Sequence, residues 1–202
     1  MSKDPVNKYF VDQYKQLHSD HENYGKSSNE KVRIVLSLVD DLSAKSVLDY
    51  GCGKSSLMDG VVSRRRVSVG RYDPAIDEYK DKPRGEFSLV VCTDVMEHIP
   101  EDDVSAVLND IRGFSGNAFF SISTRKAKAT LPDGQNAHAT VRGDEWWMER
   151  VRESFGGACL LKGEKDLIYV ATWTPSPLST IRFKLGVLYF KINKKLKKKI
   201  KR

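Results

Sequence analysis

One stretch, Ser46–Leu57, constrains the fold of this chain more than any other. It starts with the apolar residues Val47 and Leu48, passes through an acid into two glycines, Gly51 and Gly53, and continues as a polar run. This order is typical of a β-strand, a tight turn and a helix start in an open α/β sheet, whose ligands bind at the carboxyl ends of the strands. Glycines let the main chain approach a ligand, and the helix start offers free N–H groups. The stretch therefore predicts a doubly wound α/β fold that binds a nucleotide-like cofactor.

Three kinds of ligand suit such a turn, and a glycine turn can also bind nothing. A phosphate-binding P-loop requires glycine at position 48, where this chain has Leu48, and a dinucleotide fingerprint requires glycine at position 56, where it has Ser56. The run Val47–Ser55 instead resembles the first motif of the class I S-adenosylmethionine-dependent methyltransferases. That resemblance implies an S-adenosylmethionine site at Asp49, Gly51, Cys52 and Gly53.

A second acid, Asp73, follows the predicted strand Val67–Tyr72. A carboxylate at this strand end can accept hydrogen bonds from both ribose hydroxyls of a nucleoside, although Asp-Pro pairs also form ordinary turns. Thr93 and Asp94, at the end of the predicted strand Phe87–Thr93, complete the predicted cofactor-binding set.

The remaining pattern alternates strands with helices, which predicts a parallel, Rossmann-like sheet. The last two predicted strands, Ala158–Leu161 and Leu167–Trp173, form an antiparallel hairpin, as at the edge of the methyltransferase sheet. Only a short segment separates Asp73 from Phe87, and a crossover alone needs about a dozen residues. We therefore expect the third strand of the methyltransferase sheet to be missing or vestigial, and the acid that holds adenine to have no counterpart. The other predicted elements are the strands Ser46–Tyr50 and Asn117–Ser123 and the helices Pro5–His18, Lys31–Leu42, Ser55–Arg65, Glu101–Phe114 and Gly143–Phe155.

The segment Thr93–Pro100 resembles the DVLEHIP-type segment of the ubiquinone-biosynthesis O-methyltransferases. If a helical turn begins there, Asp94, Glu97 and His98 share one face. They resemble the metal-binding set of the small-RNA 3′-terminal 2′-O-methyltransferases, in which a later loop supplies another histidine, here His138. The resemblance implies a metal at Asp94, Glu97, His98 and His138, and such mixed donors suit Mn²⁺, Fe²⁺ or Mg²⁺.

Several interpretations of this segment stay open. A metal would act as a Lewis acid on substrate hydroxyls, whereas without metal His98 or His138 would act as a general base. The predicted catalytic set is Asp94, His98 and His138, but either histidine can also serve only the structure. Lys126 and Lys128 make the loop before His138 basic, which suits an acidic substrate group. Of the adjacent Trp146 and Trp147, one is expected to pack in the core and the other to line the acceptor pocket.

The net charge of +7 is concentrated at the C-terminus. Ten of the 34 lysines and arginines lie in Arg182–Arg202, which has no acid, so residues 1–181 hold 24 basic and 27 acidic residues. Apolar residues recur there every three or four positions, from Leu178 to Ile200. This pattern predicts a basic amphipathic helix over 178–202 that can lie on an anionic membrane surface. Packing of its first half onto the body is the main alternative, and nucleic acid is less favoured.

The sequence thus predicts three parts: a cofactor-covering segment at 1–30, a methyltransferase domain at 31–174, and a linker with the basic helix at 175–202. The start of the chain lacks a secretory pattern, and Cys52, Cys92 and Cys159 lack zinc or disulfide spacing, which predicts a cytoplasmic protein that is at most peripheral to the membrane. We expect O-methylation of a glycan or another small molecule. The alternatives are RNA 2′-O-methylation and a non-catalytic cofactor-binding scaffold. The sequence indicates no oligomeric state.

Overall fold

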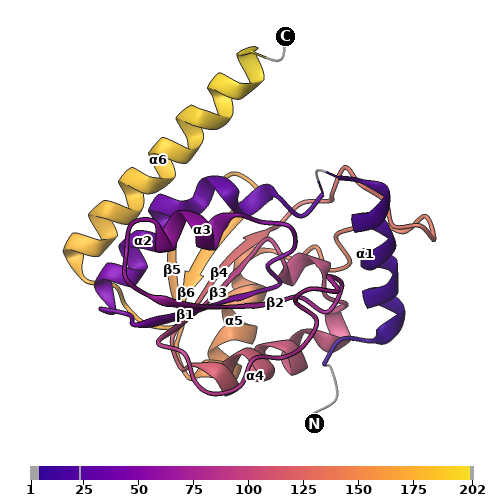
Figure 1. Cartoon of the computed structure of the whole chain (residues 1–202), viewed down its shortest axis with the longest axis horizontal. Helices are drawn as coiled ribbons and strands as arrows, with labels where there is room; N and C mark the ends of the chain where they lie inside the picture. The colour runs from indigo at the N-terminus through magenta and orange to yellow at the C-terminus, as the bar shows by residue number, and fades with distance from the viewer. Residues whose placement is uncertain (1–4, 23, 201–202) are drawn as a thin grey trace.

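A six-stranded sheet with helices on both faces forms the body of the computed structural model, which describes residues 5–22 and 24–200 (Figure 1). The strand order is β2-β1-β3-β4-β6-β5. The first four of these strands run parallel, while β6 is antiparallel to both β4 and β5. The strands are β1 (Ser46–Tyr50), β2 (Ser68–Tyr72), β3 (Leu89–Thr93), β4 (Ala118–Ser123), β5 (Cys159–Glu164) and β6 (Leu167–Ala171).

The helices divide between the two faces because each buries one apolar stripe against the sheet. On one face, α4 and α5 pack over side chains such as Leu48 and Phe120. On the other, α2, α3 and α6 cover side chains such as Val47 and Phe119. The helical elements are α1 (Lys8–Asp20), η1 (Ser27–Lys31), α2 (Val32–Asp41), α3 (Leu57–Val62), η2 (Met96–His98), η3 (Glu101–Asp103), α4 (Val104–Phe114), α5 (Asp144–Phe155) and α6 (Pro177–Ile200).

The predicted sheet is confirmed, including the missing strand. No strand lies between Tyr72 and Leu89 in this fully described stretch, so β2 is the edge of the sheet. The short segment between β2 and β3 consists of turns and bends, and within it the main-chain N–H of Asp73 donates to the carbonyl of Tyr79 (2.9 Å). The predicted acid for adenine has no counterpart on a third strand, because that strand does not exist.

Several element boundaries differ from the predictions by a few residues, and two of these differences change the local description. The helix that was predicted over Ser55–Arg65 begins at Leu57, because the side-chain oxygen of Asn29 accepts hydrogen bonds from the Ser55 hydroxyl (2.9 Å) and the Ser56 N–H (2.8 Å) and holds both residues outside the helix. The strand β5 extends to Glu164, so the connection that was expected over Lys162–Asp166 is a tight turn at Lys165 and Asp166.

The C-terminal helix α6 is one continuous element that packs along α2 (Figure 1). The Ser179 hydroxyl donates to the carbonyl of Ser37 (2.8 Å), and a Cβ at Gly186 would lie only 3.1 Å from the main-chain nitrogen of Ile34. The preceding segment is fixed to the body, since the carboxylate of Asp41 accepts from the Ser176 hydroxyl (2.6 Å). Within the described residues, none of the helices combines the length and apolar character that crossing a bilayer requires.

Candidate active site

The glycine turn after β1 is shaped by main-chain contacts. Gly51 and Gly53 have φ angles of +73° and +52°, a region that favours glycine. A Cβ at Gly51 would lie 2.4 Å from the side chain of Val95, so a larger residue does not fit there. The N–H groups of Gly51 (2.7 Å) and Cys52 (3.1 Å) donate to the carbonyl of Tyr72 at the end of β2. Both predicted strand ends therefore meet at one edge of the sheet.

Asp73 and Asp49 lie on either side of this turn. The carboxylate of Asp73 accepts hydrogen bonds from the N–H groups of Gly53 (2.8 Å) and Ala75 (2.9 Å) and borders the cavity. Asp49 is buried behind the turn, and burial raises its pKa to about 7. One of its oxygens, Oδ2, has no hydrogen-bond partner among the described residues. The turn thus holds one carboxylate at the cavity surface and one beneath it.

Asp94, directly after β3, connects this strand end to Lys31 at the junction between η1 and α2. It has a φ of +58°, and its carboxylate accepts from Lys31 Nζ (2.5 Å) and the Ser121 hydroxyl (2.9 Å). Burial alone would raise its pKa, but the ion pair and hydrogen bond with Lys31 outweigh this effect and keep the pKa of Asp94 below its usual range. Thr93, just before it, donates from its hydroxyl to Ser28 (2.7 Å). Asp94 is therefore a charged partner of Lys31 as well as part of the cavity wall.

The structure brings together three of the four predicted metal ligands. One ligand atom from each of Glu97, His98 and His138 lies within 4.8 Å of the other two, and the imidazole centroids of His98 and His138 are 4.9 Å apart. Asp94 is outside this group, because its carboxylate is turned to Lys31 and Ser121. The prediction of a single face for 94, 97 and 98 is wrong for this reason: the positive φ of Asp94 breaks the helical turn, and η2 starts only at Met96.

Both histidines use the same ring nitrogen to contact the main chain. Nδ1 of His98 lies 2.5 Å from the carbonyl of Ala137, and Nδ1 of His138 lies 2.5 Å from the carbonyl of Arg125. A carbonyl only accepts, so each Nδ1 carries the proton and each Nε2 keeps a free lone pair. Burial and the neighbouring His138 lower the pKa of His98 to about 4, and burial lowers the pKa of His138. Both rings are thus neutral at pH 7.

Glu97 completes the group as a buried acid. Its Oε1 accepts from the N–H of Ser123 (3.1 Å), whereas its Oε2 has no partner among the described residues. Burial, with a contribution from the Asp94 carboxylate, raises the pKa of Glu97 to about 8. A buried carboxyl with an unsatisfied oxygen is costly, so Glu97 is a candidate for binding a ligand.

The turn and the histidine pair open into one cavity of about 970 Å³. A site of this size has room for a nucleoside cofactor and a small acceptor together. The glycine turn and Asp73 border one part, and Glu97, His98 and His138 border another. Arg125, Lys126 and Lys128 also line the wall, as the basic loop predicted.

The expectation for the two tryptophans is half correct. Trp147 is fully buried in the core. Trp146 does not reach the cavity wall. It lies instead between the guanidinium groups of Arg142 and Arg150, 5.9 Å and 5.6 Å from its ring. It therefore packs on the surface of α5 and does not form part of the acceptor pocket.

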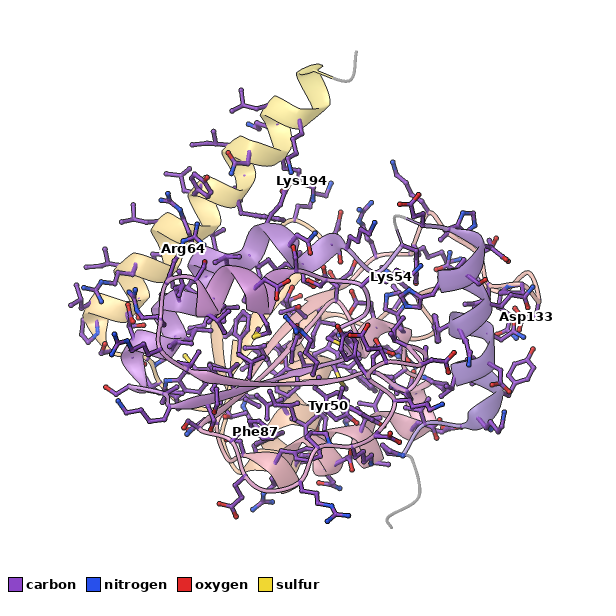
Figure 2. All side chains as sticks on the ribbon, viewed as in Figure 1. Tyr50, Lys54, Arg64, Phe87, Asp133 and Lys194 are labelled. Atoms are coloured by element: carbon purple, nitrogen blue, oxygen red, sulfur yellow. The ribbon has the colours of Figure 1, made fainter. Side chains whose placement is uncertain are left out.

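The N-terminal segment supplies the outer wall of the cavity. Tyr14 of α1 donates from its hydroxyl to the carbonyls of His98 (2.8 Å) and Ala137 (3.0 Å), which joins α1 to both histidine segments. Lys54, between the glycine turn and α1, donates to the carbonyl of His18 (2.5 Å) (Figure 2). On the far side, the loop around Asp133 is held by the Tyr9 hydroxyl (2.6 Å). The described part of the segment 1–30 thus borders the cavity, and its cofactor-covering role stays a prediction.

Lys31 is the site residue that sequence reasoning missed. Only 1% of it is exposed. It lies at the junction between η1 and α2, where its side chain pairs with Asp94. A signal for it exists in the sequence, because Lys31 shares helical spacing with Ile34, Val35 and Leu38, which are all buried. A lysine on the apolar stripe of a helix requires an anionic partner, and the strand end at Asp94 provides it.

Comparison with known proteins places these features in a family. A family model described as a methyltransferase domain matches residues 24–165. A ubiquinone biosynthesis O-methyltransferase of Hahella chejuensis is 25% identical over 198 residues, with 83% of each chain covered. A second one, from Aromatoleum aromaticum, is 28% identical over 115 residues and covers 45% of this chain and 49% of its own.

A solved structure shares the fold at low identity. The 1,6-didemethyltoxoflavin-N1-methyltransferase of Burkholderia thailandensis, bound to its substrate and to S-adenosylhomocysteine, superposes with a TM-score of 0.56 at 14% identity, covering 85% of this chain and 89% of its own. By its name that protein methylates nitrogen, while the Hahella chejuensis relative is named for oxygen. The shared fold thus leaves the acceptor atom to be argued from the site.

Proposed function

The chain belongs to the class I S-adenosylmethionine-dependent methyltransferases, and from that premise we propose that it methylates a hydroxyl oxygen of a glycan or another small molecule. The observation that carries the proposal is the pair of neutral imidazoles at His98 and His138, each with a free Nε2. A hydroxyl must lose its proton to attack a methyl group, and a neutral imidazole is a suitable acceptor for it. The relatives named as O-methyltransferases support the same choice of atom.

The three-residue group also fits a divalent cation. Metal-bound histidines commonly donate their other ring N–H to a main-chain carbonyl, as both histidines do here. The unpartnered Oε2 of Glu97 adds an anionic oxygen once the carboxyl has lost its proton. One carboxylate and two imidazoles suit Mn²⁺ or Fe²⁺ as well as Mg²⁺. When bound, such a cation would lower the pKa of a hydroxyl that it contacts.

The residues of the chain divide the work along the cavity. Asp73 and the glycine turn hold the cofactor, with Asp49 beneath the turn, and the acceptor hydroxyl lies by the Nε2 atoms of His98 and His138. His98 receives the hydroxyl proton on Nε2 when no cation is present. Glu97, with its raised pKa, must release its own proton before it binds a cation. Asp94, predicted as catalytic, is reassigned to positioning, because its carboxylate is committed to Lys31 and Ser121.

The test is transfer of labelled methyl from S-adenosylmethionine to three acceptor sets: glycosides with neighbouring hydroxyls, catechols, and RNA oligonucleotides. The proposal predicts label in a hydroxyl compound, with the O-methyl group located by mass spectrometry. If a chelator abolishes methyl transfer and Mn²⁺, Fe²⁺ or Mg²⁺ restores it, then Glu97, His98 and His138 act by binding a metal. If transfer is equal with and without chelator, the histidines act as general bases.

The alternative acceptor is RNA. The same assay distinguishes RNA from a glycan or another small molecule. Label that enters only the oligonucleotides identifies a 2′-O-methyltransferase of RNA. Label that enters only base nitrogens of the oligonucleotides contradicts O-methylation altogether.

A further inference from the structure

The outer side of α6 carries a continuous apolar stripe that no described part of the chain covers. Its members are between 49% and 60% exposed. At about 100° per residue, they fall within an arc of roughly 80° on the helix. Most of the exposed large apolar side chains in the described part of the chain lie on this one helix. The stripe consists of Leu178, Ile181, Leu185, Leu188, Ile192 and Leu196.

The stripe is not the face that holds α6 to the body. That contact is made by the opposite face, where Phe183, Val187 and Phe190 are buried. Figure 1 shows α6 lying along α2 and continuing past the body at its C-terminal end. Since α6 has already buried one apolar face, the second stripe is available to a partner.

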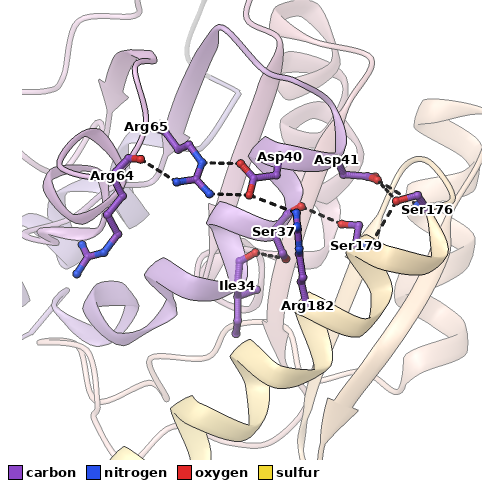
Figure 3. Close-up of polar contacts among 9 residues, drawn as sticks. All are labelled: Ile34, Ser37, Asp40, Asp41, Arg64, Arg65, Ser176, Ser179 and Arg182. Carbon is purple, nitrogen blue, oxygen red and sulfur yellow. Dashed lines mark hydrogen bonds and ion pairs between the residues drawn. The ribbon is translucent and has the colours of Figure 1, made fainter.

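Positive charge borders the stripe. Arg182, Lys184, Lys191 and Lys195 lie on α6, and no Asp or Glu follows Asp166 in the whole sequence. The neighbouring surface adds Arg33, Arg64 and Arg65, which line a shallow hollow together with Arg182. The acid in this hollow, Asp40, already accepts two hydrogen bonds from Arg65 (2.6 and 2.7 Å) and pairs with Arg182 (3.7 Å) (Figure 3). The partner that fits is therefore apolar in the middle and anionic at its edges.

From this geometry we infer that the stripe of α6 docks on an anionic membrane surface, with its leucines and isoleucines at the boundary between headgroups and acyl chains and its lysines and arginines on lipid phosphates. The helix would lie flat, because its charged flanks run along its whole length. The inner face of the same helix contributes Phe190, Lys194 and Lys197 to the wall of the active-site cavity. Docking therefore brings the cavity next to the bilayer.

A second copy of the chain suits the stripe less well. Two stripes in contact would place the cations of both helices side by side, without an acid from either α6 to separate them. Like charges at such a distance repel, and two-helix contacts usually rely on opposite charges at their edges. A membrane with anionic lipids provides the missing negative charge.

The experiment is sedimentation of the full-length protein with vesicles of phosphatidylcholine alone or of phosphatidylcholine mixed with phosphatidylglycerol. The protein is expected to sediment with the mixed vesicles, not with phosphatidylcholine alone, and to be released by high salt. The double variant Leu185→Glu with Ile192→Glu should lose binding. The matched control, Leu160→Glu, replaces a leucine that is 46% exposed on β5 and should bind as the parent does.

A second set of variants tests the charges. Replacing Lys184, Lys191 and Lys195 with Gln should lower the partition coefficient by about a hundredfold, at about fivefold per lysine. A control with Lys80, Arg84 and Arg152 replaced by Gln removes the same charge from elsewhere and should bind within about twofold of the parent. All variants should bind S-adenosylhomocysteine normally, since the exchanged side chains do not line the cavity.

Three outcomes overturn the inference. The first is sedimentation that does not depend on phosphatidylglycerol or that persists in the Leu185→Glu, Ile192→Glu variant. The second is a dimer by light scattering that this variant dissociates, with no vesicle binding. The third is tight binding to an RNA oligonucleotide without binding to either vesicle.

Discussion

The two ends of the active-site cavity are built in different ways. At the cofactor end, which comprises the glycine turn Tyr50–Lys54 with Asp73, neighbouring main-chain groups hold the shape, as in the hydrogen bonds from Gly51 and Cys52 to Tyr72. At the acceptor end, which comprises Glu97, His98 and His138, side chains from distant segments meet and bond to carbonyls. The cofactor end is therefore a property of the fold. The acceptor end depends on side chains of this chain, and under the proposed function it determines which acceptor is methylated.

The sharpest way to separate the two ends is to remove one imidazole. His98→Gln should lower methyl transfer by about 10²- to 10⁴-fold, because it removes the group that prepares the hydroxyl. Binding of S-adenosylhomocysteine, measured by calorimetry, should stay within about twofold, since the cofactor end is intact. His21→Gln, at an exposed histidine, should change neither quantity. A His98→Gln enzyme that is as active as the parent would disprove the role of the imidazole.

A substitution at Lys31 tests whether its ion pair with Asp94 organises the site between the two ends of the cavity. Its side chain and that of Asp94 are 2% and 19% exposed, so Lys31→Met leaves a mostly buried carboxylate without its cation. We expect the free energy of unfolding in urea to fall by about 3 kcal/mol. Adding Asp94→Asn should recover most of the loss, because asparagine tolerates the positive φ at this position.

The matched surface control is Lys8→Met. It breaks an ion pair whose side chains are 84% and 56% exposed and should change stability by less than about 1 kcal/mol. If Lys31→Met is no more destabilising than Lys8→Met, the Lys31–Asp94 pair does not organise the site.

Asp73 tests the cofactor end alone. Asp73→Asn removes a charged acceptor for ribose hydroxyls and should weaken S-adenosylhomocysteine binding by about 2 kcal/mol, or roughly thirtyfold. At saturating S-adenosylmethionine the rate should recover, because the acceptor end is unchanged. Asp77→Asn, at an exposed aspartate that pairs with Lys15, should bind the cofactor normally. Loss of rate at saturation in Asp73→Asn would show that the two ends are not separable.

The buried acid at the cofactor end predicts a pH dependence of stability. Because burial raises the pKa of Asp49 to about 7, the folded chain keeps a proton that the unfolded chain releases above about pH 4. The contribution of Asp49 to the free energy of unfolding is thus greatest below pH 4 and is lost as the pH rises to 7. Relative to Asp49→Asn, the parent should lose on the order of 4 kcal/mol of unfolding free energy across this window, because the folded and unfolded pKa values differ by about three units. Urea titrations of both proteins at a series of pH values measure it, and a constant difference would contradict the assignment.

The sequence predicted the cofactor end better than the acceptor end, for a physical reason. Asp49, Gly51 and Gly53 lie close together in the chain, at every second position, so their spacing alone describes the turn. The short segment after Asp73 likewise predicted the missing strand. His98 and His138 were paired only through resemblance, and the sequence did not show that Asp94 has a positive φ that turns its carboxylate to Lys31. Such a departure depends on three-dimensional packing, in this case on a buried lysine from another layer.

The most direct test is a crystal structure of the S-adenosylhomocysteine complex. The account predicts that the ribose hydroxyls contact Asp73 and that the cofactor sulfur, from which the methyl group leaves, faces the Nε2 atoms of His98 and His138. A cofactor that binds elsewhere, or whose sulfur points away from Glu97, His98 and His138, would contradict it.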